Sequence, residues 1–156
     1  MQDPRAFEFY QMKTFFRVGP LAQISLIACL YVLTTIGCYF EAGATGKLYG
    51  YPISVSMLFV PIYEELIFRG ILLKVFENRY GALKAIVLTS VLFGLWHLKN
   101  IFWLDLQQLF KQIVFTTFVF GPLTAWLTLK ARTLWPAVIL HYINNFPFDA
   151  WINHFK

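Results

Sequence analysis

The sequence carries five long apolar runs separated by short polar stretches, and this pattern limits the folds open to the chain. A helix that crosses a bilayer needs about 20 mainly apolar residues, and lipid offers an open backbone no hydrogen-bond partners. The chain is 58% apolar and 13% charged, whereas soluble domains average about 25% charged residues. We therefore expect an all-α, polytopic membrane protein, a bundle of about five transmembrane helices at residues 18–40, 52–76, 83–98, 109–129 and 134–152.

The predicted organisation is a short N-terminal segment followed by one membrane domain. Residues 1–17 mix aromatic and charged side chains, which is typical of a helix lying in the membrane interface, and residues 18–156 form the membrane-embedded domain. The run at 18–40 exceeds the roughly 7–15 apolar residues of a signal peptide, so we expect it to remain as an anchor. Its two cysteines, Cys29 and Cys38, are expected to be packing residues.

The basic residues indicate orientation and partners. The net charge is +5, but the cations are scattered between the apolar runs and form no basic stripe, so we expect a lipid bilayer and no nucleic acid as partner. Lys and Arg accumulate on the cytoplasmic side of membrane proteins. The charges favour a cytoplasmic N-terminus in a multi-pass protein, and the short chain suits a bacterial cytoplasmic membrane. In that orientation the inside segments hold Arg5, Lys13, Arg17, Lys74, Arg79, Lys84, Lys130 and Arg132, and the outside segments hold Lys47, Lys99, Lys111 and Lys156.

The second apolar run contains Lys74 near its end and three charged residues in its middle, Glu64, Glu65 and Arg69. Charges at membrane depth cost roughly 2.5–3.5 kcal/mol each on insertion scales, so these three suggest function. Glu65 and Arg69 are four residues apart and share a helix face, so they are expected to pair, either as structural support or as part of a site. Glu64 points about 100° away. The residue four positions after it is Phe68, so this helix offers Glu64 no cation at that spacing. Glu64 is the candidate general base.

Two further runs add histidines. His97 ends the third run, with Phe93 one turn earlier, where its ring could pack beside the imidazole. Alone, His97 also fits an ordinary interfacial residue. In the fifth run His141 and Asn145 are four residues apart and both can donate hydrogen bonds. Such a pair can stabilise an oxyanion or can join two helices within the membrane.

Together the three clusters supply the groups that hydrolyse an amide with an activated water: a base, imidazoles and oxyanion donors. The sequence contains neither a G-x-S-x-G nor an H-E-x-x-H motif. A membrane-interior hydrolase of another type is therefore expected, with its polar site inside the bundle.

The ordered motifs resemble a known family. Glu-Glu-x-x-x-Arg at 64–69, Phe-x-x-x-His at 93–97 and His-x-x-x-Asn at 141–145 are similar to those of the CAAX protease and bacteriocin-processing family of intramembrane glutamic endopeptidases. The likeness covers about residues 52–148. Many members carry more spans than this chain, so the resemblance leaves the prenyl-protein substrate of eukaryotic members open and also fits processing of small secreted peptides or membrane-anchored precursors.

The resemblance implies a role for each motif residue. Glu64 would activate water, with His97 helping to hold that water, and His141 with Asn145 would form the oxyanion hole. Glu65 and Arg69 would orient the site, and Phe93 would be a packing residue. The implied substrate is a peptide or protein at the membrane, and no cofactor is implied.

Two other hypotheses remain open at this point. Glu64, His97 and His141 could instead bind zinc as a His₂Glu site with one open position. Alternatively, the chain could be a non-catalytic bacteriocin-immunity or membrane scaffold protein, in which the same polar residues join helices.

Overall fold

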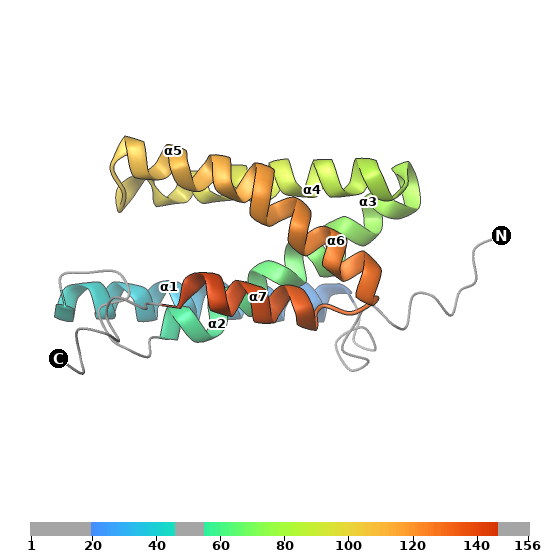
Figure 1. Ribbon diagram of the computed structural model, residues 1–156. Helices are drawn as coiled ribbons and strands as arrows, with labels where there is room; N and C mark the ends of the chain where they lie inside the picture. The colour runs from blue at the N-terminus through green and yellow to red at the C-terminus, as the bar shows by residue number, and fades with distance from the viewer. Residues whose placement is uncertain (1–19, 46–54, 147–156) are drawn as a thin grey trace. The chain divides into compact units, whose positions relative to one another are not determined.

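The computed structural model describes residues 20–45 and 55–146, and these are helical with short connections and no strand (Figure 1). The all-helical prediction is confirmed for this part of the chain. The elements are α1 (Pro20–Thr45), α2 (Val55–Glu65), η3 (Leu66–Leu72), α3 (Leu73–Tyr80), α4 (Ala82–Trp96), η4 (His97–Phe102), α5 (Leu106–Phe115), η5 (Thr116–Phe120), α6 (Gly121–Ala131) and α7 (Trp135–Asn145). The expected interfacial segment at residues 1–17 lies outside the described residues.

The described residues divide into two compact units. The central unit is Glu65–Ala137, which runs from the end of α2 to the start of α7. The flanking unit comprises 20–45, 55–64 and 138–146, that is α1, most of α2 and most of α7. The boundary between the units falls between Glu64 and Glu65, the two adjacent carboxylates singled out by the sequence.

In the central unit, α4 packs antiparallel against the continuous helix formed by α5, η5 and α6 (Figure 1). Small residues allow this close approach. A Cβ on Gly94 would overlap Thr117 Oγ1, and a Cβ on Gly121 would lie 2.9 Å from Ser90 Cβ. Ser90 and Gly94 are four residues apart on one helix, and Thr117 and Gly121 are four apart on the other. Each helix therefore presents a small-x-x-x-small face to its neighbour, as helices packed within membranes commonly do.

Two π-helical segments interrupt the helices: η3 lies between α2 and α3, and η5 lies between α5 and α6. In η3 the Leu73 amide donates to the Phe68 carbonyl, and in η5 the Gly121 amide donates to the Thr116 carbonyl, each five residues back. Pro122, the second residue after η5, has no amide hydrogen for the Phe118 carbonyl, which favours a wider turn there. Single π turns inside α-helices often mark functional sites, and η3 begins directly after the Glu64-Glu65 pair.

Several predicted boundaries are wrong. Residues 41–45 belong to α1 rather than to a loop, because Ala42 and Ala44 are strong helix formers. The second run continues as helix to Tyr80 and breaks only at Gly81, whose φ of 81° suits glycine. The connector expected at 99–108 is shorter, since η4 extends to Phe102 and Asp105 caps α5 by accepting from the Gln108 amide. In the fifth run, α7 ends at Asn145.

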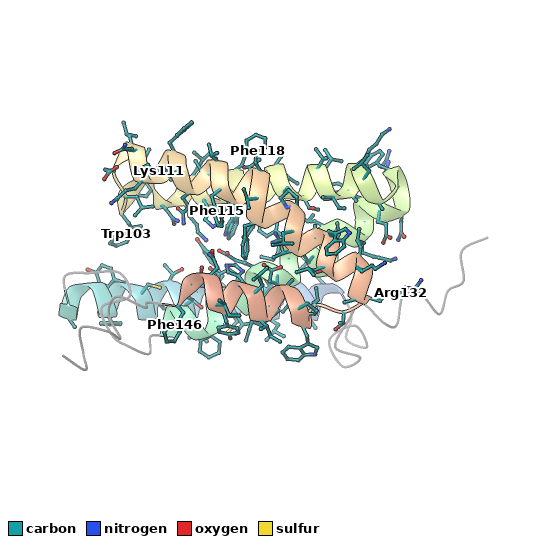
Figure 2. The ribbon with its side chains drawn as sticks, viewed as in Figure 1. Trp103, Lys111, Phe115, Phe118, Arg132 and Phe146 are labelled. Carbon is teal, nitrogen blue, oxygen red and sulfur yellow. The ribbon has the colours of Figure 1, made fainter. Side chains whose placement is uncertain are left out.

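Among the described residues, two helices are long and apolar enough to cross a membrane: Ala82–Phe102 and Leu106–Ala131, both in the central unit. Only 33% of the apolar window of each is buried, whereas the core helix of a soluble protein would be mostly covered. The exposed side chains include Phe118, which is 73% exposed and points away from the ribbon in Figure 2. This exposed apolar surface fits a protein embedded in lipid. Within the described residues, two of the five expected spans meet the length and apolarity requirement.

Candidate active site

In the central unit, the ion pair expected between Glu65 and Arg69 is present. Arg69 Nη1 donates to Glu65 Oε1 at 3.2 Å, and both side chains are fully buried. The two residues come from the end of α2 and the middle of η3. Because a buried charge is tolerated only when it is paired and hydrogen-bonded, each member of the pair requires the other.

The Arg69 guanidinium also ties η3 to the start of α6. Its Nη2 atom donates to the Gly121 carbonyl oxygen at 3.4 Å and to Thr124 Oγ1. Thr124 is itself fully buried and donates its own hydroxyl proton to the Phe120 carbonyl, which leaves an oxygen lone pair for the guanidinium. Arg69, which lies within η3, is thus held by Gly121 and Thr124, which follow η5.

Phe93 lies between the guanidinium and an imidazole. The Arg69 Cζ atom is 4.2 Å from the centre of the Phe93 ring, an arrangement that favours a cation over the ring face. The His97 ring packs edge-to-face with the Phe93 ring, with ring centroids 4.8 Å apart and an interplanar angle of 88°. Phe93 is fully buried, and its packing beside both side chains matches the position suggested by its place one turn before His97.

The geometry of His97 assigns its ring protons. Its Nδ1 atom lies 2.7 Å from the Phe93 carbonyl oxygen, and a carbonyl can only accept a hydrogen bond. Nδ1 therefore carries the hydrogen, and in the neutral ring Nε2 is the nitrogen that can accept a hydrogen bond from water. Nearby, Asn100 Nδ2 donates to Gln112 Oε1 at 2.9 Å and fastens η4, which begins with His97, to α5.

In the flanking unit, α2 and α7 bring the other carboxylate and the second histidine together. His141 Nε2 lies 3.8 Å from Glu64 Oε2, and both side chains are buried, at 3% and 2% exposure. This distance is too long for a direct hydrogen bond, but a water between the two atoms could bond to both. Tyr63, next to Glu64, packs edge-to-face on Tyr31 of α1 and so fixes this end of α2.

Asn145 is the last residue of α7 and is half-buried. Asn144 Nδ2 donates to Asn145 Oδ1 at 3.1 Å. With its oxygen accepting this bond, Asn145 has its amide Nδ2 group as the donor that could act on a substrate. It lies one helical turn after His141, on the same side of α7.

The seven predicted residues thus form two groups, one in each unit. Glu65, Arg69, Phe93 and His97 are connected in the central unit. The flanking unit holds Glu64, His141 and Asn145, with the first two in contact.

The sequence does not point to the α6 groups that hold Arg69, nor to the pair that fastens η4, the segment of His97, to α5. They are Thr124 with the Gly121 carbonyl, and the Asn100–Gln112 pair. One signal was available: Thr124 and Thr128 are four residues apart in an otherwise apolar helix, and both are fully buried. Their spacing marks a polar face, but it does not say which charge that face meets.

Comparison with protein families gives one match. A family model described as type II CAAX prenyl endopeptidase, Rce1-like, matches residues 47–147 of the 156. Comparison with curated proteins and with solved structures found no match. All of the predicted site residues lie inside the matched segment.

Proposed function

The chain belongs to the Rce1-like family of type II CAAX prenyl endopeptidases, and from this membership we propose that it is an intramembrane endopeptidase that uses a glutamate-activated water. The family is a protease family, so hydrolysis of a peptide bond is the reaction class. The identity of the base and of the oxyanion donors is our proposal.

The observation that carries the proposal is the different surroundings of two adjacent glutamates. Glu65 is neutralised by Arg69 at 3.2 Å, whereas Glu64 lies 3.8 Å from an imidazole nitrogen. A carboxylate committed to a guanidinium is a poor base, whereas one that lies beside an imidazole is well suited to accept a proton. Glu64 is therefore the base, and Glu65 holds Arg69 in place.

The reaction then follows from the donors and acceptors. Glu64 takes a proton from water, whose oxygen attacks the scissile carbonyl carbon. As the family resemblance implies, His97 helps to hold that water by accepting a hydrogen bond at Nε2. The negative charge on the carbonyl oxygen is stabilised by hydrogen bonds from His141 and Asn145. When the C–N bond breaks, the proton held by Glu64 passes to the leaving amine. No metal takes part in these steps.

We propose that the protein is a multi-pass membrane protein with five spans and a cytoplasmic N-terminus, as its apolar runs and basic residues predict. Its substrate is a peptide or protein in or at the bilayer. The family description names a CAAX prenyl endopeptidase. For this chain we propose a membrane-associated precursor or a small secreted peptide.

The test compares wild type with Glu64→Gln and with Glu77→Gln, expressed at equal levels in the native host. Glu77 is a glutamate on α3 that pairs with Lys74 near the surface, so it controls for the loss of a carboxylate. The termini of membrane-associated peptides are then identified by mass spectrometry. We expect new termini with wild type and Glu77→Gln and none with Glu64→Gln. The same termini with Glu64→Gln would refute the proposal.

Two alternatives have their own readouts. A zinc protease using Glu64, His97 and His141 predicts stoichiometric zinc in the purified protein and loss of cleavage with a chelator. An immunity or scaffold protein predicts that Glu64→Gln keeps the biological effect of the wild type. The buried Glu64–His141 contact supports the proposal of a glutamate base.

A further inference from the structure

One end of the central unit gathers most of its positive charge. Residues 73–84, which cover α3 and the start of α4, contain Lys74, Arg79 and Lys84, and residues 128–132, at the end of α6, contain Lys130 and Arg132. Glu77 is the one acidic residue in these two segments, and it pairs with Lys74 at 3.1 Å. We call these five cations the basic end.

Packing brings the two segments together. Leu73, Ala85 and Ala125 form one buried cluster, against which Phe76 and Leu129 pack. Three of these buried or packed residues have a lysine as a neighbour in the sequence. Lys74 follows Leu73, Lys84 precedes Ala85, and Lys130 follows Leu129. The cations of α3, α4 and α6 therefore surround the same apolar cluster rather than lying on separate faces.

Exposed aromatic residues stand at the same end. Tyr80 closes α3 and is 45% exposed, with the Arg79 guanidinium 5.5 Å from its ring centre. Trp135 follows Arg132 by three residues and is 55% exposed. Tyrosine and tryptophan beside cations are typical of the level of lipid headgroups.

The backbone at Arg132 adds a separate observation. It is the one non-glycine residue with positive φ among the described residues, at φ 53° and ψ 33°, just after α6. Glycine is the usual residue where a helix ends in this left-handed conformation. Arg132 (Figure 2) adopts an unfavourable backbone conformation, which indicates a functional role for its side chain.

We propose that the basic end binds the headgroups of anionic phospholipids in one leaflet and so fixes the protein in the bilayer. Clusters of four to eight Lys and Arg beside membrane helices attract anionic lipids, each cation contributing to the binding. This inference rests on the membrane placement proposed above and not on the peptidase activity.

The experiment measures which lipids stay with the purified protein. Full-length protein is extracted from vesicles of equal phosphatidylglycerol and phosphatidylcholine, and retained lipids are counted by mass spectrometry. We expect wild type to keep phosphatidylglycerol preferentially, and Lys84→Gln/Lys130→Gln/Arg132→Gln to lose the preference by at least about tenfold. The control Lys99→Gln/Lys111→Gln removes two cations, half-buried Lys99 and exposed Lys111, from the opposite end and should retain the preference. An unchanged triple variant, or an equal loss in the control, would overturn the proposal.

Two further variants separate lipid binding from folding and from catalysis. Arg132→Gly relieves the backbone and removes the charge, so it should leave the unfolding temperature equal or higher while phosphatidylglycerol retention falls; unchanged retention would count against the role of Arg132. Glu64→Gln should retain lipids as wild type does, whatever its effect on cleavage. Displacement of phosphatidylglycerol by millimolar inorganic phosphate would mean a general anion site and would overturn the assignment to lipid.

Discussion

At the scale of single residues, the two adjacent glutamates have separate surroundings because they lie about 100° apart on one helix. The Glu65–Arg69 pair could be predicted from its i, i+4 spacing. The role of Thr124 could not, because it depends on a contact between residues 55 positions apart. Local spacing identifies pairs on one helix, whereas long-range partners depend on how helices pack.

Loss of Glu65 is expected to destabilise the fold strongly. Glu65→Ala leaves the fully buried Arg69 without its carboxylate, and breaking a buried pair in this way costs about 3–5 kcal/mol. Thermal unfolding in detergent and the yield of inserted protein measure the effect. Lys74→Ala breaks the partly exposed Lys74–Glu77 pair and should cost no more than about 1 kcal/mol. Equal stability of the two variants would contradict the structural role of the Glu65–Arg69 pair.

At the scale of elements, the helical segments follow from the apolar runs, but the two π segments do not. An extra residue in a turn shifts the residues after it by about 100° around the axis. In runs made mostly of apolar residues this shift leaves no clear mark, so the sequence reads as one continuous α-helix. Pro122 is the one local sign of the second π segment, since it removes a backbone donor. The end of α1 at Thr45 was also missed, because glycine and polar residues after Phe40 suggested a loop.

The close contact of α4 with η5 makes Gly94 sensitive to substitution. Gly94→Ala places a methyl group where Thr117 Oγ1 now lies, and overpacking of this kind costs about 1–3 kcal/mol. Adding Thr117→Ala removes that oxygen and should restore most of the stability, as measured by thermal unfolding. Gly43→Ala is the matched control, since nothing lies within 4 Å of its position. If the double variant is no more stable than Gly94→Ala, this contact is not the cause.

At the scale of the whole molecule, the sequence predicted the all-helical class, and the two described helices of sufficient length fit a membrane protein. Five spans stay a prediction, because within the described residues two helices, Ala82–Phe102 and Leu106–Ala131, meet the length and apolarity requirement. Within the central unit, His97 follows the 15-residue α4, about 22 Å along its axis from the basic end at 1.5 Å per residue. His97 is therefore expected near the membrane surface opposite the basic end.

This arrangement predicts opposite labelling of two surface positions. In a variant without Cys29 and Cys38, Gln107→Cys should react with an impermeant maleimide on intact cells. Asn78→Cys, on the basic end, should react only after the cells are opened. Both positions are exposed and neither is a cation, so the charges that set the orientation are kept. Labelling of Asn78→Cys on intact cells would reverse the predicted orientation.

The most direct measurement is the cleavage rate of Glu64→Gln relative to wild type, under single-turnover conditions, on a peptide whose cleavage the terminus comparison identifies. Removal of a general base is expected to lower the rate by about 10²–10⁴-fold. The unfolding temperature should stay close to that of wild type, since the isosteric amide keeps the shape of the side chain. Cleavage by Glu64→Gln at the wild-type rate would contradict the assignment of Glu64 as the base that activates water.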